Sequence, residues 1–206
     1  MNNKTPQQDF VIYCDMDGVL CDFPRHATDL MNKSLYDENV PQITRLKGLK
    51  ALETDGLSKF EYSTDGNVPR PYRSYMYDLI SNNTNFWATM PFAPGGVELW
   101  RNLRDIKKGS PNITVELLTT PTDEASKRGK LEWITKNLGQ IITNFSKTKW
   151  EYAMPTTLLI DDRSKNINAF KKAGGFVIPY DMNKPSEPEE TIIKLCIICE
   201  FVPRFR

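Results

Sequence analysis

The sequence predicts an α/β fold in which a parallel β-sheet is flanked by helices. Five short apolar runs have the length and residue types of buried strands. Segments with helical periodicity separate most of these runs, an alternation typical of parallel sheets with right-handed crossovers. The five runs are 9–14, 113–118, 140–145, 157–160 and 176–179.

Composition places the chain among globular proteins. The 206 residues suffice for one domain, or for one domain with a modest insertion. Hydrophobic residues make up 39% and charged residues 26%, and 27 Lys and Arg balance 26 Asp and Glu. This balance creates no whole-protein field that would attract nucleic acid or anionic membrane. No apolar run approaches the roughly 20 residues of a membrane span, and the polar N-terminus lacks a secretory signal, so we expect a cytoplasmic protein.

Two residue counts exclude classes of chemistry. The chain has one histidine, His26, so it cannot build a multi-histidine metal site. Its four cysteines are too few and too scattered for a disulfide scaffold. The C-x-x-C pair Cys196 and Cys199 has no second pair and no histidine nearby, so we interpret these two as buried apolar residues rather than as a zinc or redox site.

The N-terminal half begins with the strand 9–14, which runs into the acidic, glycine-containing turn 15–18. A helix is expected over 25–36. Residues 37–90 differ in composition: they are rich in aromatic residues, prolines and glycines. We expect only short helices there. The core positions expected in the helix 25–36 are Leu30, Met31 and Leu35. We interpret 37–90 as an insertion with its own small core.

The C-terminal half alternates strands and helices. A helix opens at 94–96 and a second covers 123–138, before and after the strand 113–118. The inward positions expected in 123–138 are Ala125, Leu131, Ile134 and Leu138. Ser164 is the expected cap of a third helix that ends at Ala173. A last helix is predicted over the apolar residues 192–202.

Polar residues follow four of the five strands. Because ligands bind beyond the carboxyl ends of parallel strands, we expect these residues to meet at one edge of the sheet. They are Asp15 and Asp17 after the first strand, Thr119 and Thr120 after the second, Lys147 and Lys149 after the third, and Asp161, Asp162 and Arg163 after the fourth.

Crowded carboxylates repel one another unless a cation lies among them. A hard divalent ion with oxygen ligands removes this conflict, and Mg²⁺ suits a site that also holds a phosphate. Lysine and threonine groups would then face the remaining phosphoryl oxygens. The set therefore indicates phosphoryl transfer, in which positioning and charge neutralisation supply most of the catalysis.

Four motifs in this order resemble those of the haloacid dehalogenase (HAD) superfamily phosphatases. They are DMDGVLCDF at 15–23, LTTP at 118–121, a downstream lysine, and LLIDDR at 158–163. Their details, together with Lys130-x-x-Trp133, are similar to the 5′(3′)-deoxyribonucleotidase family. The resemblance implies a Rossmann-like HAD core at 1–23 and 92–206, with a small, mainly helical cap inserted after the first strand at 24–91.

The resemblance also implies roles for individual residues. Asp15 would be the nucleophile that forms an aspartyl-phosphate, and Asp17 the general acid and then the general base. Mg²⁺ would be held by Asp15, by Asp17 through its main-chain carbonyl, and by the pair Asp161 and Asp162, with the direct ligand of that pair left open. The phosphate would contact Thr119, Thr120 and Lys147. The spacing from Lys147 to Asp161 is longer than expected in this family, which leaves Lys149 as the alternative.

Substrate choice would come from the insertion. Phe23, Phe86 and Trp87 resemble the aromatic residues that face the base in the deoxyribonucleotidases, although Phe86 and Trp87 fit a small core equally well. Arg163 also matches the family and would contact substrate or lock the cap. A cap of this kind closes over the site and excludes water.

The expected function is a Mg²⁺-dependent phosphomonoesterase acting on deoxyribonucleoside monophosphates. One alternative is an HAD phosphatase for nucleic-acid 3′ ends or another small phosphate ester, and the near-neutral charge argues against a polynucleotide. A second is a catalytically idle HAD-like binding protein. The expected partner is thus a small-molecule substrate and not a membrane; base preference, tolerance of ribose, 5′ or 3′ phosphate and a homodimer stay open.

Overall fold

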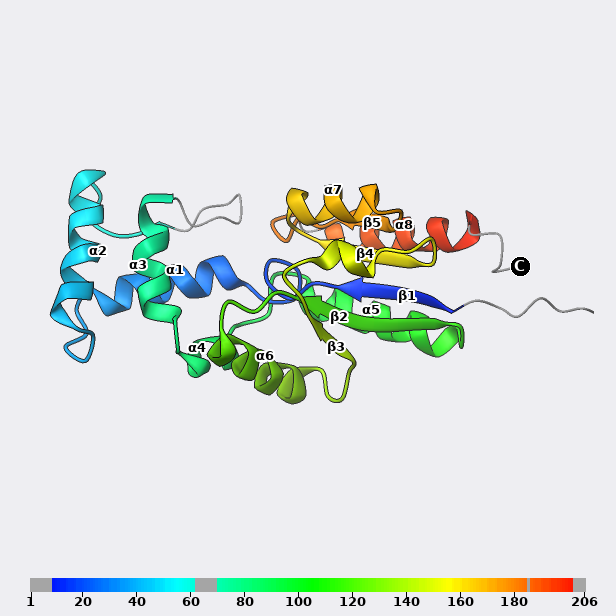
Figure 1. Ribbon diagram of the computed structural model, residues 1–206, viewed down its shortest axis with the longest axis horizontal. Helices are drawn as coiled ribbons and strands as arrows, with labels where there is room; N and C mark the ends of the chain where they lie inside the picture. The colour runs from blue at the N-terminus through cyan, green and yellow to red at the C-terminus, as the bar shows by residue number, and fades with distance from the viewer. Residues whose placement is uncertain (1–8, 62–69, 185, 202–206) are drawn as a thin grey trace, which may run out of the picture. The chain divides into compact units, whose positions relative to one another are not determined.

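The computed structural model describes residues 9–61, 70–184 and 186–201. Within these residues one sheet of five parallel strands has the order β3-β2-β1-β4-β5 (Figure 1). The predicted α/β class is therefore confirmed. The strands are β1 (Phe10–Cys14), β2 (Ile113–Thr119), β3 (Thr143–Phe145), β4 (Thr157–Asp161) and β5 (Phe176–Pro179).

The strand order contains a switch point beside β1. The chain proceeds from β1 through β2 to β3 on one side, and then continues with β4 and β5 on the other. Cys14 of β1 pairs with Ile160 of β4, and the N–H of Asp15 donates to the carbonyl of Ile160 at 3.0 Å. The carboxyl ends of β1 and β4 are thus adjacent, and a switch point of this kind is where open α/β sheets bind ligands.

Helices cover both faces of the sheet because its central strands are apolar on both faces. Phe170 of α7 (Ser164–Lys172) packs with Tyr13, Leu118 and Leu159 on one face. The residues next to these in the strands point to the other face. There α5 (Gly96–Gly109) packs against β2, and α8 (Glu187–Phe201) against α5 and β5. The fully buried neighbours are Ile12, Cys14, Leu117, Leu158 and Ile160.

The chain divides into two compact units. One combines residues 1–21, 92–120 and 140–206, and the other combines 22–91 with 121–139. The second unit contains α1 (Phe23–Ser34), α2 (Gln42–Thr54), α3 (Arg70–Ile80), α4 (Thr84–Ala88) and α6 (Glu124–Asn137). The sequence did not indicate that α6 groups with residues 22–91, and the predicted division into 1–23, 24–91 and 92–206 stays a prediction about domains.

Local signals explain where the helices of the second unit begin. The Asp22 carboxylate accepts from the N–H of Arg25 at 3.2 Å, and Pro24 occupies the first turn of α1, where its missing N–H costs nothing. Asp123 caps α6 in the same way and forms a capping box with Ser126. Phe60 packs against the rings of Tyr72 and Tyr75, which gives this unit an aromatic core of its own.

Several expectations need correction. Residues 37–90 contain helices of 13 and 11 residues, α2 and α3, rather than only short ones. Leu131 is 43% exposed, because Lys130, Trp133 and Ile134 occupy the buried face of α6. Ser164 is the first helical residue of α7, which Arg163 precedes without a side-chain cap.

The C-terminal segment differs from its expectation in two respects. The predicted helix 192–202 is part of α8, which starts earlier, at Glu187; Val202 lies outside the described residues. Cys196 is exposed, which corrects its expected burial, and the side chain of Cys199 lies outside the described residues; Cys14 and Cys21 are buried. Among the residues that the structure describes, no helix combines the length and apolarity needed to cross a membrane.

Candidate active site

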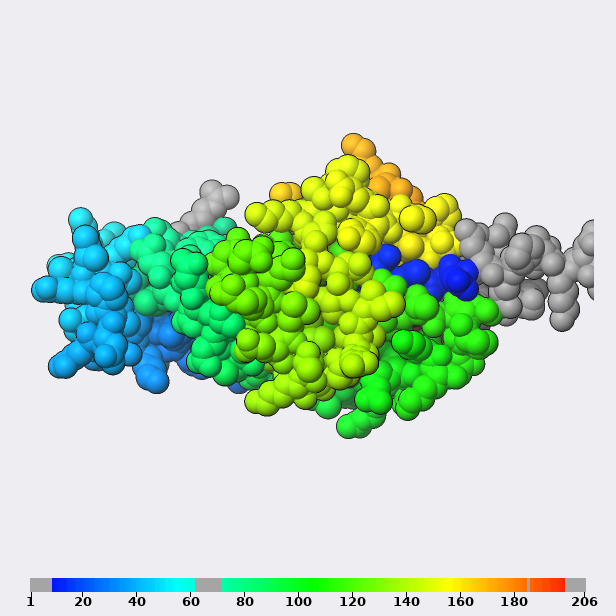
Figure 2. All heavy atoms as spheres, turned by 60° about the horizontal axis from the view of Figure 1, so that its bottom comes forward, coloured from blue at the N-terminus to red at the C-terminus, as the bar shows by residue number. Residues whose placement is uncertain are grey.

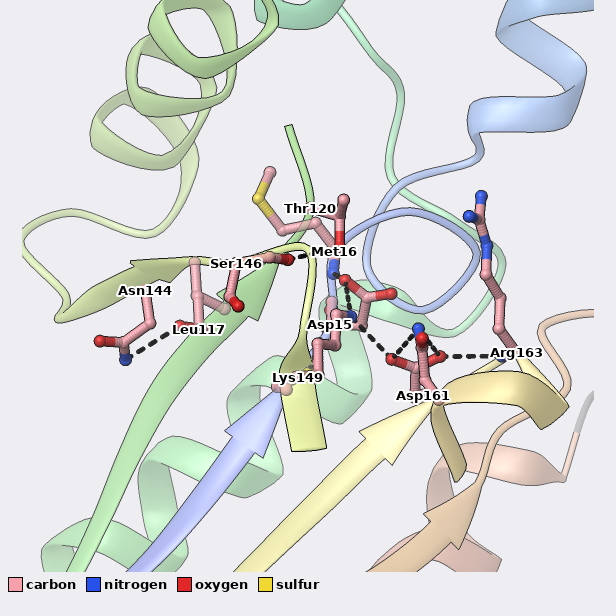
Figure 3. A network of polar contacts seen from close by, with 11 residues as sticks. Asp15, Met16, Leu117, Thr120, Asn144, Ser146, Lys149, Asp161 and Arg163 are labelled. Carbon is pink, nitrogen blue, oxygen red and sulfur yellow. Dashed lines mark hydrogen bonds and ion pairs between the residues drawn. The ribbon is translucent and has the colours of Figure 1, made fainter. Parts of the chain in front are cut away.

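Three carboxylates meet at the switch point of the sheet, and Figure 3 shows two of them, Asp15 and Asp161. Asp15 directly follows β1, and Asp161 is the last residue of β4, with Asp162 next to it. One oxygen from each of these side chains lies within 4.8 Å of the others. The strand pairing of β1 and β4 therefore brings together residues that are almost 150 positions apart in the sequence, as the motif order predicts.

Lys149 is the cation of this cluster. Its Nζ lies 2.8 Å from Oδ1 of Asp15 and 2.7 Å from Oδ2 of Asp161, and its side chain is 2% exposed. Burial by itself lowers the pKa of Lys149, but the charges of Asp15 and Asp161 and the hydrogen bonds to both outweigh it and raise the pKa. Lys147 is exposed, so the structure brings the alternative lysine, not Lys147, to the acids.

Asp161 is fully buried and held from several sides. Its Oδ1 accepts from the N–H of Arg163 at 2.8 Å and from Nδ2 of Asn166 at 3.1 Å. Nδ2 of Asn166 also lies 3.0 Å from Oδ2, the oxygen that faces Lys149. These donors stabilise the ionised carboxylate, yet burial and the charge of Asp15 prevail and raise the pKa of Asp161.

Asp162 is the least compensated acid of the cluster. Burial and the charges of Asp15 and Asp161 raise its pKa to about 8. Within the described residues its buried Oδ1 has no hydrogen-bond partner. Three clustered carboxylates, one with an unsatisfied oxygen, fit a hard divalent cation such as Mg²⁺, which supplies the positive charge that the cluster lacks.

Asp17 lies in a tight turn that directly follows Asp15. The N–H groups of Leu20 and Cys21 donate to the carbonyl of Met16, both at 2.8 Å. Gly18 has a φ of 78°, and a Cβ there would lie 2.7 Å from Cγ of Asp162. Only glycine combines this left-handed conformation with so close an approach, which explains the Asp-x-Asp-Gly order of the first motif.

The two threonines after β2 differ in their surroundings. Thr119 ends β2, is fully buried, and accepts from the N–H of Ser146 at 3.0 Å through its carbonyl. The hydroxyl of Thr120 donates to the carbonyl of Ser146 at 2.7 Å (Figure 3). A hydroxyl has one proton, so in this arrangement the Thr120 side chain donates to the protein's own main chain.

Arg163 projects from the same edge of the sheet. Its side chain is exposed, and in Figure 3 it extends away from the Asp161 carboxylate. Partial desolvation at this edge acts to lower its pKa, but the negative charges of Asp162, Asp15, Asp17 and Asp161 outweigh it and raise the pKa. It therefore remains a cation available at the rim of the acid cluster.

The predicted base-facing aromatics lie together in the second unit. Phe23 stacks on Trp87 with 5.5 Å between ring centroids and forms a T-shaped pair with Phe86, with 5.8 Å between centroids. Phe86 and Trp87 are 3% and 1% exposed, whereas Phe23 is partly exposed. Lys130 lies 5.2 Å from the Trp87 ring centroid and is fully buried. Burial favours the small-core interpretation of Phe86 and Trp87.

The sequence did not single out Asn166 or Ser146. Asn166 lies in the first turn of α7, and its distance of five residues from Asp161 would have been a usable signal, because a helix that starts after an acid returns its first turn toward it. Ser146 acts through its main-chain carbonyl and through a hydroxyl that accepts from the N–H of Thr148, local loop contacts that no periodic pattern reveals.

Comparison with solved structures shows the same fold. A protein described as a haloacid dehalogenase-like hydrolase from Burkholderia xenovorans LB400 is 16% identical, with 87% of each chain covered and a TM-score of 0.52. One described as a β-phosphoglucomutase from Thermotoga maritima is 16% identical over 91% of this chain and 99% of its own, with a TM-score of 0.51. One described as a phosphatase from Clostridium acetobutylicum is 17% identical over 92% and 99%, also with a TM-score of 0.51. No curated protein matches the chain.

The switch-point acids on this sheet define the class of protein, an HAD-like phosphatase. The family described as 5′ nucleotidase, deoxy (pyrimidine), cytosolic type C protein matches residues 9–191. The chain belongs to this family, and it is a phosphoric monoester hydrolase.

Proposed function

We propose that this protein is a Mg²⁺-dependent phosphatase of deoxyribonucleoside monophosphates that acts through an aspartyl-phosphate. The observation that carries the proposal is the group of Asp15, Asp161 and Asp162, the first two of them buried, with Lys149 in contact with two of the three. The family description, which names deoxy pyrimidine nucleotides and the cytosol, supports the substrate class and a cytoplasmic location.

Asp15 is suited to be the nucleophile. Its Oδ1 accepts from the N–H of Met16 and from Lys149, both at 2.8 Å, which fixes the carboxylate and leaves Oδ2 to attack phosphorus. The new Asp15–phosphorus bond replaces the bond from phosphorus to the nucleoside oxygen. Lys149 neutralises charge on Asp15 and on the phosphoryl oxygens as this exchange occurs.

Asp17 is assigned the proton transfers. It gives a proton to the departing nucleoside oxygen, and its carboxylate then takes a proton from the water that attacks the aspartyl-phosphate. This second step releases inorganic phosphate and restores Asp15. Thr119 is assigned to donate to the phosphoryl group, and Arg163 to contact the substrate from the rim.

Mg²⁺ would be held by Asp15, Asp161 and Asp162 together with the main-chain carbonyl of Asp17. When bound, the ion neutralises the carboxylates and the phosphate that would otherwise repel each other. The protein prepares this position by keeping Asp161 in place through Asn166 and the Arg163 N–H.

The test is phosphate release from dUMP and dTMP with Mg²⁺ or with excess EDTA. We expect activity in Mg²⁺, its loss in EDTA, and its loss in Asp15→Asn, while the exposed Asp105→Asn on α5 retains it. Full activity of Asp15→Asn would exclude the covalent mechanism. A larger loss in Lys147→Ala than in Lys149→Ala would return the phosphate role to Lys147.

The same assay separates the alternatives. Preference for 3′-phosphorylated oligonucleotides or for a sugar phosphate over every deoxynucleotide would change the substrate class and keep the chemistry. Absence of turnover on all phosphomonoesters in Mg²⁺ would indicate a catalytically idle protein.

A further inference from the structure

Two adjacent residues at the end of β2 hold the main chain of Ser146 on both sides. The carbonyl of Thr119 accepts from the Ser146 N–H at 3.0 Å, and the hydroxyl of Thr120 donates to the Ser146 carbonyl at 2.7 Å. Figure 3 shows this second bond beside the acid cluster. The first of these bonds continues the pairing of β2 with β3, whereas the second depends on a side chain.

Ser146 in turn sets the start of the segment that carries Lys149. Its Oγ accepts from the N–H of Thr148 at 3.0 Å, and the carbonyl of Thr148 accepts from the N–H of Glu151 at 3.0 Å. These bonds start the 3-10 helix η1 (Lys149–Tyr152) at Lys149. Hydrogen bonds thus link Thr120 to Ser146 and Ser146 to Thr148, the residue directly before the lysine that contacts Asp15.

We infer that Thr120 is a positioning residue, whose hydroxyl fixes Ser146 so that Lys149 reaches Asp15 and Asp161. This inference rests on the proposed function, because it assigns Thr120 a task within the same site. It differs from the sequence-based assignment of Thr120 as a phosphate ligand. The one hydroxyl proton of Thr120 is donated to the Ser146 carbonyl and so does not point to a phosphate.

The position of β3 explains why such a bond is needed. β3 has three residues and lies at the edge of the sheet, where it pairs with β2 alone. The segment beyond it, yellow in Figure 2, lies on the surface, and Trp150 and Met154 are 49% and 56% exposed. A flexible four-carbon lysine side chain delivers its charge to a fixed point only if its backbone is fixed.

The first experiment compares steady-state kinetics of Thr120→Val, Thr120→Ser and the wild type on dTMP. Valine keeps the branched shape and removes the hydroxyl, so we expect kcat to fall on the order of tenfold, with a smaller change in KM. Serine restores the donor and should restore kcat. Thr114→Val is the matched control, since it lies in β2 and its buried hydroxyl has no partner among the described residues.

The second experiment repeats Thr120→Val in a Lys149→Ala background. If Thr120 acts through Lys149, the substitution changes kcat by less than about twofold there, because the charge it positions is gone. A full additional loss in that background, or a Thr120→Val effect confined to KM, would overturn the inference in favour of direct phosphate binding. An inactive wild type would instead refute the proposed function.

Hydrogen exchange of the metal-free protein gives a readout independent of turnover. Peptides covering 146–149 should exchange faster in Thr120→Val than in the wild type or in Thr120→Ser, while peptides of β1 and β4 stay unchanged. Unchanged exchange over 146–149 would show that the hydroxyl does not fix this segment.

Discussion

At the scale of single residues, the site holds more negative charge than its own cation neutralises. Lys149 contacts Asp15 and Asp161, whereas Asp162 keeps a buried oxygen without a partner in the described part of the chain. Without a divalent ion this arrangement opposes ionisation, which is why the pKa of Asp162 rises to about 8. The site is thus prepared for a cation at a cost to the metal-free protein.

This cost predicts the pH dependence of stability in EDTA. An unfolded aspartate has a pKa of about 3.9, so between about pH 4 and pH 8 the folded protein holds a proton on Asp162 that the unfolded chain has lost. Unfolding then releases a proton, and the free energy of unfolding falls as the pH rises through this window, by at most about 1.4 kcal/mol per pH unit. The raised pKa of Asp161 acts in the same direction.

Urea unfolding in EDTA at several pH values between 5 and 8.5 measures this slope. Asp162→Asn should flatten it, because the amide cannot ionise, and should make the metal-free protein more stable at pH 8 than the wild type. If the free energy of unfolding depended on pH in the same way in both proteins, Asp162 would not be the acid whose raised pKa causes the slope. Asp105→Asn, an exposed site on α5, serves as the control and should leave the slope unchanged.

At the scale of elements, periodicity predicted the strands and most helices but not every buried face. The strand runs are continuous and apolar, so their burial on both sides follows directly from composition. In α6 the buried face includes Gly129 and Lys130, which no hydrophobic pattern marks as interior. Lys130 is buried because its ammonium lies over the Trp87 ring, a tertiary contact that periodicity cannot reveal.

Gly129 has a testable packing role between α6 and α4. A Cβ there would lie 2.6 Å from Cβ of Trp87 and 3.1 Å from the nitrogen of Ala88, and would also contact the carbonyl of Thr84. Alanine normally favours a helix interior by about 1 kcal/mol over glycine. Forced contacts with backbone typically cost more, so we expect Gly129→Ala to lower the free energy of unfolding by roughly 1–2 kcal/mol.

The control is Gly109→Ala at the end of α5, where a Cβ meets nothing within 4 Å. It should leave stability unchanged or raise it slightly. Denaturant unfolding of the two variants and the wild type measures these differences in the free energy of unfolding. Equal stability of Gly129→Ala and Gly109→Ala would show that α4 and α6 are less closely packed than the structure indicates.

At the scale of the whole molecule, the motif acids and the aromatic cluster belong to different compact units. Asp15, Lys149, Asp161 and Asp162 belong to the unit that contains the sheet, and Phe23, Phe86 and Trp87 to the other. The acids could be placed from sequence because strand ends and parallel topology determine where they meet. The choice between Lys147 and Lys149 could not, because it depends on the start of η1 after the edge strand.

The last prediction assigns base recognition to Phe23. Phe86 and Trp87 are buried, so truncating either should cost stability, whereas Phe23 is partly exposed and can offer a ring to a base. Stacking on an aromatic ring contributes about 1–3 kcal/mol per base, so Phe23→Leu should lower kcat/KM for dTMP on the order of tenfold or more. Leucine keeps an apolar side chain and removes the flat face.

The matched substrate is 2-deoxyribose 5-phosphate, which carries the same sugar and phosphate without the base. Its kcat/KM should be the same in Phe23→Leu and in the wild type, because the reacting groups are unchanged. Phe176→Leu, in the edge strand β5 at 36% exposure, is the control variant and should leave both substrates unaffected. A loss on both substrates in Phe23→Leu would mean that Phe23 supports the catalytic turn that precedes it rather than the base. A loss on neither would place base recognition on other residues.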